Sequence, residues 1–163
     1  MRNFLLILTS FTFYLSADLK VSLDQELKTL MPKVIEWRHD IHEHPELGNR
    51  EFRTSNKVKV HLEGLGIKVE SGIAYTGVVG LIEGGKPGPT IALRADMDAL
   101  PVEEKTGLPF ASKVRTKYLG NDVGVMHACG HDAHVAILMG VAEFLAKNKS
   151  CLLYTSDAAD EGV

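Results

Sequence analysis

The sequence has little net charge, little cysteine and no long apolar run. Its formal net charge is −3, and its lysines and arginines form no cluster, which argues against a nucleic-acid partner. No apolar run is long enough to span a bilayer comfortably, and no repeat or low-complexity segment occurs. Cysteine is limited to Cys129 and Cys151, and we expect no disulfide between them. With 163 residues, 45% of them hydrophobic and 24% charged, the chain is expected to form a soluble globular domain of ordinary size.

The first 17 residues have the layout of a secretory signal peptide. Met1 and Arg2 give a short positive start, residues 4–15 are almost wholly apolar, and Ser16 and Ala17 are small. Leu15, three positions before the predicted cleavage point, departs from the small-residue rule. A retained or buried N-terminal helix is therefore the alternative. The pattern predicts an exported protein, periplasmic or secreted, without a stable membrane anchor.

Residues 125–134 concentrate the reactive side chains of the chain. Within them, Cys129 and His131 are separated by a single glycine. Because glycine has no Cβ, the sulfur of Cys129 and an imidazole nitrogen of His131 can approach the same point without a side chain between them. Thiolate and imidazole are ligand types that zinc and its transition-metal neighbours prefer. The spacing therefore favours a metal site. Core packing of a buried cysteine and structural histidines is one alternative, and a nucleophilic Cys–His pair is the other.

Hydrophobic spacing predicts alternating helices and strands, and hence an α/β fold. The first helix is expected to begin at Ser22, which with Gln25 fits a capping box, and Pro32 either bends it or marks its true start. The further predicted elements are a helix over residues 51–65, strands over 67–70, 76–83 and 90–98, a loop over 101–124 and a helix over 133–147. The last helix is apolar nearly all round, which predicts burial against a sheet.

The predicted strand over residues 90–98 alternates most regularly. Its apolar side chains share one face, while Asp96 and Asp98 lie on the other near its carboxyl end. Open α/β sheets bind their ligands at this end of the strands. Taken alone, both carboxylates are ordinary solubilising groups. With the Cys129–His131 pair downstream, they become candidates for metal ligands or for the partners that orient them.

Four histidines outside that pair have local interpretations. His39, His42 and His44 precede Pro45 at the polar end of the first helix, where the helix dipole favours positive charge. We expect them to be solvated or hydrogen-bonded there, and a second metal site is the alternative. His134 is expected to share one helix face with His131, three positions earlier.

Three motifs, in order, resemble one family. They are residues 39–48 (HDIHEHPELG), 93–101 (LRADMDALP) and 124–132 (GVMHACGHD). Together they resemble the metal-dependent amidohydrolase branch of the aminoacylase/carboxypeptidase superfamily. This branch includes hippurate hydrolases, indole-acetyl-amino-acid hydrolases and N-acetyldiaminopimelate deacetylases. The resemblance covers about residues 23–149.

The resemblance implies an enzyme that cleaves the amide bond of N-acyl amino acids or related peptides. It implies the N-terminal part of a mixed-sheet, zinc-peptidase-like catalytic domain over residues 18–149, without the family's lid or dimerisation domain. Two divalent metal ions, zinc or manganese, are implied, with Cys129 and His131 as ligands. Asp98 corresponds to an acidic residue that orients a ligand, and Asp96 stands where relatives outside this branch carry a ligating histidine. Homo-oligomerisation of the full-length protein is left open.

The tail departs from the family pattern. In the family, a Glu-Glu pair downstream of the last helix supplies the base, and no such pair follows here. Residues 150–163 resemble a translated sequencing adaptor, so we expect a non-native tail and an inactive polypeptide, with a divergent genuine terminus as the alternative. Two other functions stay open. One is a non-catalytic metal-binding or interaction module ending near Lys149, and the other is a redox or nucleophilic Cys129 without metal.

Overall fold

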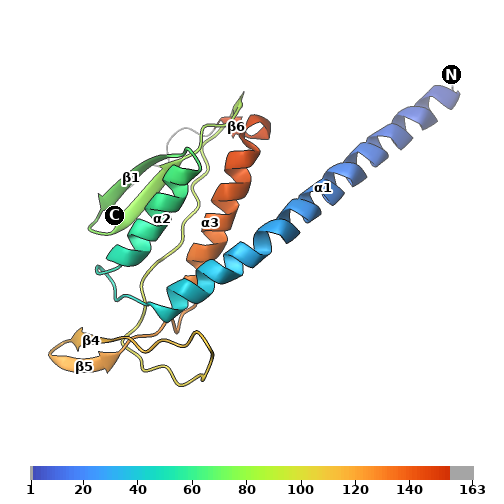
Figure 1. The fold of residues 1–163 in the computed structure, drawn as a ribbon. Helices are drawn as coiled ribbons and strands as arrows, with labels where there is room; N and C mark the ends of the chain where they lie inside the picture. Colours follow the sequence, from blue (N-terminus) through green and yellow to red (C-terminus); the bar gives the residue numbers. More distant parts are fainter. Residues whose placement is uncertain (1, 155–163) are drawn as a thin grey trace. The chain divides into compact units, whose positions relative to one another are not determined.

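The computed structural model describes residues 2–154 and places the side chains of residues 23–152. The chain divides into two compact units, residues 1–32 and 33–163, which are described separately. Helix α1 (Arg2–Glu43) contains Pro32 and is already helical well before Ser22, so the predicted start at Ser22 is wrong (Figure 1). Among the described residues, no helix is both long and apolar enough to cross a membrane.

The signal-peptide prediction concerns side chains that the structure does not place. The backbone of residues 2–17 belongs to α1, but the side chains of residues 1–22 lie outside the description. Most of the predicted non-native tail, residues 155–163, also lies outside the described residues. The signal peptide and the non-native tail both stay predictions.

The second unit alternates helices and strands, which confirms the α/β class. Its other elements are α2 (Phe52–Gly64), β1 (Lys68–Ile73), β2 (Gly77–Leu81), β3 (Lys86–Pro87), β4 (Arg115–Tyr118), β5 (Asn121–Gly124), α3 (His131–Lys147), the short 3₁₀ helix η1 (Lys149–Cys151) and β6 (Leu153–Tyr154). The predicted helices over 51–65 and 133–147 are confirmed as α2 and α3. The predicted strands over 67–70 and 76–83 are confirmed as the antiparallel pair β1–β2, in which Lys68 lies opposite Leu81.

The strands of the described part form three two-stranded sheets. β3 and β6 pair in parallel, whereas β4 and β5 pair antiparallel with Arg115 opposite Gly124. The β4–β5 hairpin corrects the prediction of an uninterrupted loop over 101–124. Its two turn residues, Leu119 and Gly120, both have positive φ (50° and 81°), as a type I′ hairpin turn requires. The glycine at this position was the sequence signal for the turn.

The predicted strand over residues 90–98 is not formed within the described part of the chain (Figure 1). A strand needs a hydrogen-bonded neighbour, and bridges occur just beyond this segment, where Ala99 pairs with Leu47 and Leu100 with Met126. The predicted apolar face is present in part. Ala95 and Met97 pack against the core, while Ile91 and Leu93 are exposed. The alternation therefore still places Asp96 and Asp98 on the side away from the core.

The core of the second unit joins the end of α1 to α3. Ile41 of α1 is fully buried against Val135 and Met139 of α3. Trp37, Val58, Ala95 and Met97 pack around them. α3 is less completely buried than predicted, since Ile137 is 55% exposed.

His61 of α2 gives the second unit a stability that depends on pH. Its Nε2 contacts the carbonyl oxygen of Met139 at 3.0 Å, and its ring packs edge-on against Trp37. Burial lowers the pKa of His61 below its ordinary value of 6.5. Because the unfolded chain binds the proton more readily, this contribution is complete above pH 6.5 and is lost as the pH falls through the folded pKa.

We therefore expect the unfolding free energy to fall more steeply between about pH 7 and about pH 5 in the unchanged chain than in a His61→Gln variant. Glutamine keeps a donor for the Met139 carbonyl but does not titrate. Chemical denaturation at several pH values measures both slopes. Equal slopes in the two proteins would show that the protonation of His61 is not coupled to unfolding. The control is His44→Gln, at an exposed histidine, which should leave the slope of the unchanged chain as it is.

Candidate metal centre

A sharp turn before α3 presents Cys129 and His131. Gly130 caps the helix with a φ of +83°, a left-handed conformation that side chains other than glycine adopt at a cost. The carbonyl of Gly130 accepts the backbone N–H groups of Ala133 and His134, which starts the helix. Cys129 is left exposed as a free thiol, and His131 becomes the first residue of α3.

Asp98 holds His131 from one side. Nδ1 of His131 lies 2.9 Å from the backbone oxygen of Asp98 and 3.0 Å from its carboxylate Oδ1. Both oxygens are acceptors, so Nδ1 carries a proton, and in the neutral ring Nε2 keeps its lone pair. A histidine fixed in this way has the tautomer of a metal ligand whose other nitrogen is oriented by a carboxylate. The structure thus brings together Asp98 and His131, which are far apart in sequence.

The donors present fit a transition metal in chemical type. An exposed thiol and an imidazole with a free Nε2 flank Gly130, and side chains of this kind bind zinc and its neighbours. Within residues 23–152, no group of three His, Cys, Asp or Glu side chains gathers in a way that could hold a metal ion. The pair would therefore supply two of the three or four protein ligands that such an ion takes.

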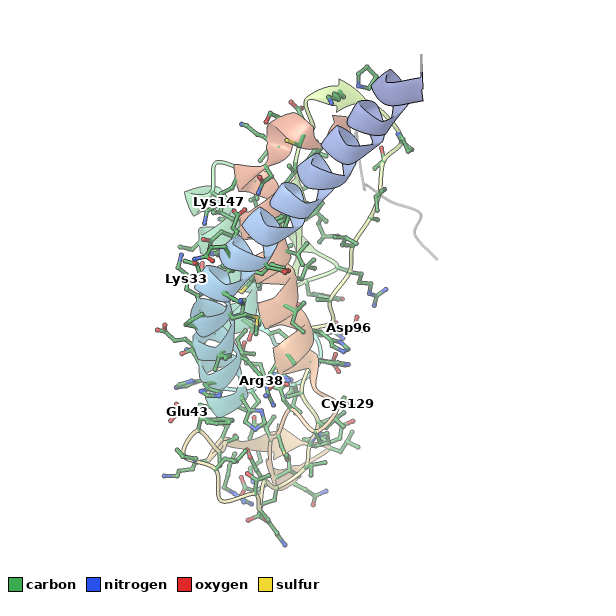
Figure 2. All side chains as sticks on the ribbon, turned by 90° about the vertical axis from the view of Figure 1, so that its right-hand side faces the viewer. Lys33, Arg38, Glu43, Asp96, Cys129 and Lys147 are labelled. Atoms are coloured by element: carbon green, nitrogen blue, oxygen red, sulfur yellow. The ribbon has the colours of Figure 1, made fainter. Side chains whose placement is uncertain are left out.

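Asp96 faces the same region without contacting Cys129 or His131 through any described hydrogen bond. Its Oδ1 accepts hydrogen bonds from Arg94 at 3.0 and 2.8 Å, and these lower the pKa of Asp96. Figure 2 shows Asp96, Cys129 and Arg38 around the N-terminal end of α3. The role of Asp96 as a ligand stays a prediction.

A buried polar network lies behind the turn. His42 of α1 contacts Asp132 of α3 through Nδ1 (2.9 Å) and Glu104 through Nε2 (3.1 Å). Arg38 donates a third bond, from Nε to Asp132 Oδ2 at 3.1 Å. Burial raises the pKa of Asp132, but the bonds from His42 and Arg38 outweigh it and keep the pKa low. Sequence reasoning expected His42 to sit at an ordinary helix end and did not connect it with Asp132 or Glu104.

The other two histidines of α1 have separate contacts. His39 stacks on Phe110 with ring centres 3.8 Å apart, and the exposed His44 contacts the backbone oxygen of Asp40 at 2.9 Å. The His44 contact is the local hydrogen bond that was predicted, whereas His39 packs on a ring that is distant in sequence.

His127 is buried, whereas Cys129 and His134 of the same stretch are exposed. Burial lowers its pKa to about 4, so its ring is neutral near pH 7. Neither ring nitrogen has a hydrogen-bond partner among the described residues, and the same holds for Oδ1 of Asp132. Buried polar atoms of this kind are usually bonded to ordered water. The backbone carbonyl of His127 accepts the N–H of Gly130 at 3.3 Å, so His127 contacts the turn through its main chain.

Gly130 gives a direct test of the turn. We expect Gly130→Ala to lower the unfolding free energy by roughly 1–2 kcal/mol, because alanine disfavours the left-handed conformation. The matched control is Gly64→Ala in α2, where an added methyl meets no atom within 4 Å and a helical alanine is favoured. Denaturant titration measures both variants. Equal or higher stability of Gly130→Ala would contradict the described turn.

Comparison with known proteins connects this geometry to a family. Residues 92–155, which include Asp98, Cys129 and His131, match the sequence profile described as Peptidase family M20/M25/M40. The chain is 51% identical over 136 residues to thermostable carboxypeptidase 1 of Saccharolobus solfataricus, covering 83% of this chain and 33% of that protein. It is 47% identical over 126 residues to N-acetyl-L-cysteine deacetylase of Bacillus subtilis, covering 77% of this chain and 28% of that protein.

A solved structure agrees with the sequence matches. The YXEP protein of Bacillus subtilis, described as a dinuclear metal binding peptidase from the M20 family, superimposes with a TM-score of 0.67 at 44% identity. The match covers 76% of this chain and 32% of that one. The chain thus spans about a third of the length of the relatives it matches.

Proposed function

This chain belongs to peptidase family M20/M25/M40, and on that basis we propose that the whole protein is a metal-dependent amidohydrolase. The observation that carries the proposal is the arrangement around His131. Asp98 holds its Nδ1, which leaves Nε2 free, and Cys129, two positions earlier in the chain, is an exposed free thiol. Each residue then has a distinct role. Cys129 and His131 bind metal, and Asp98 holds the Nδ1 proton and thereby orients the imidazole.

A divalent metal bound there would supply Lewis-acid chemistry and lower the pKa of water to about 7. We propose two ions per complete site, zinc or manganese, because a relative 44% identical in sequence is described as a dinuclear metal binding peptidase. The remaining ligands and the base that moves the proton would come from the part of the protein that this chain does not include.

We propose N-acyl amino acids or related peptides as substrates. Two relatives support this class of substrate. One is named a carboxypeptidase and the other an N-acetyl-L-cysteine deacetylase, and both names denote cleavage of an amide bond in an amino-acid derivative.

The experiment is a hydrolysis assay with the full-length protein. N-acetyl and N-benzoyl amino acids are offered before chelation, after chelation and after zinc or manganese is restored. The proposal predicts turnover that disappears with the metal and returns with it. Turnover that survives complete metal removal, or no turnover with either metal, would overturn it.

We also propose that the protein is exported and that its catalytic domain begins after residue 17. The basis is the charge and apolar pattern of residues 1–17. A fusion of residues 1–30 to a reporter that works only outside the cytoplasm should give signal, and the mature chain should be shortened. A mature protein that still begins with Met1 would contradict a cleaved signal peptide.

A further inference from the structure

We propose that His42 is a positioning residue for the metal centre, a role that rests on the proposed function. The arrangement is called here the His42 clamp and consists of His42, Asp132 and Glu104. These side chains come from the end of α1, the first turn of α3 and the segment before β4.

The clamp is buried and bonded at both ends. The side chain of His42 is 5% exposed, and those of Asp132 and Glu104 are 1% and 0% exposed. Nδ1 of His42 lies 2.9 Å from Asp132 Oδ2, and Nε2 of His42 lies 3.1 Å from Glu104 Oε1. An ionised carboxylate accepts hydrogen bonds, and each ring nitrogen of His42 faces one carboxylate oxygen. One imidazole therefore joins two buried carboxylates.

Each carboxylate organises a different part of the site. Asp132 directly follows His131 in α3, so the bond from His42 fixes the turn that carries this proposed ligand. Glu104 holds its own loop together, because its carboxylate also accepts the hydroxyl of Thr106 and the backbone N–H of Ser112. His42 thus attaches the loop over residues 104–112 to the turn before α3.

The contacts also predict that the protein folds without His42. Asp132 would keep its bond to Arg38, and Glu104 would keep Thr106 and Ser112. What is lost is the link between the two carboxylates, together with an edge-on ring contact with Phe110. The expected consequence is a less well positioned His131 and weaker metal binding in a folded protein.

The experiment measures metal affinity and cobalt spectra with the full-length protein. Zinc affinity is determined by competition with a chromophoric chelator, and the thiolate-to-cobalt absorption band is recorded after cobalt substitution. For His42→Ala we expect about tenfold weaker zinc binding and a changed cobalt band. Removal of a group that orients a metal ligand typically weakens metal binding by about 10–100-fold, and we expect the lower value here. His42→Gln, which keeps one donor, should recover part of the affinity.

His39→Ala is the matched control. It removes a ring contact with Phe110 in the same loop but touches neither carboxylate, so zinc affinity and the cobalt band should be unchanged. Thermal unfolding of the metal-free proteins confirms that the variants fold, and His42→Gln carries the test if His42→Ala does not.

Unchanged affinity and an unchanged cobalt band in folded His42 variants would overturn the positioning role. An equal effect of His39→Ala would also overturn it, because general docking of the loop would then explain the loss. Failure of the proposed function itself is recognised separately. In that case Cys129→Ala also leaves zinc affinity and the cobalt spectrum unchanged.

Discussion

Replacing Cys129 with alanine is expected to remove most of the metal bound by the full-length protein. We expect its amide-hydrolase activity to fall by a factor of at least about 100. The loss should exceed the 10–100-fold effect of residues that merely orient ligands, because the substitution deletes a metal-binding sulfur. Stability of the metal-free protein should change little, since Cys129 is exposed on the turn before α3. Mass spectrometry after dialysis gives the metal content, and an N-acyl amino acid assay gives the activity.

The matched control is His44→Ala. His44 is also an exposed side chain of a metal-binding type, but it lies at the end of α1 and contacts the backbone of Asp40 instead of the turn at Gly130. We expect its metal content and activity to equal those of the unchanged protein. Full metal content in Cys129→Ala would remove Cys129 from the ligand set.

Replacing Ile41 with alanine is expected to have the largest effect on stability, a loss of about 2–5 kcal/mol. Ile41 is 0% exposed and packs against Val135 and Met139, so the shorter side chain leaves a cavity between α1 and α3. Such a loss is a large part of the 5–15 kcal/mol that stabilises a typical domain. Denaturant titration of the metal-free protein measures it.

The control for Ile41 lies on the same helix. Ile35 is 46% exposed, so Ile35→Ala removes the same atoms without opening a cavity, and alanine favours the helix. We expect little change or a small gain in stability. Equal losses in the two variants would show that Ile41 does not occupy a tightly packed core.

The elements that the sequence predicted well are those whose stability is local. α2, α3 and the β1–β2 hairpin follow from hydrophobic spacing and from turn residues within each segment. Residues 90–98 show why other elements were predicted less well. Alternation correctly placed Ala95 and Met97 toward the core, but strand formation depends on a neighbouring strand, which the spacing of one segment does not reveal.

The candidate site divides in the same way. The Cys129–Gly130–His131 turn could be predicted from one short stretch, and Asp98 from the alternation that precedes it. The link from His42 to Asp132 and Glu104 joins positions 90 and 62 residues apart, and no local pattern reveals such a contact. The buried position of His127 was also not predictable, because a histidine in a cluster resembles a ligand until its exposure is known.

Zinc-edge X-ray absorption of the zinc-loaded full-length protein tests most directly whether Cys129 and His131 bind the metal of an amidohydrolase. We expect a sulfur neighbour at about 2.3 Å together with nitrogen or oxygen neighbours at about 2.0–2.2 Å, and loss of the sulfur in Cys129→Ser. A zinc site with nitrogen and oxygen neighbours alone in the unchanged protein, or a sulfur neighbour that persists in Cys129→Ser, would contradict it.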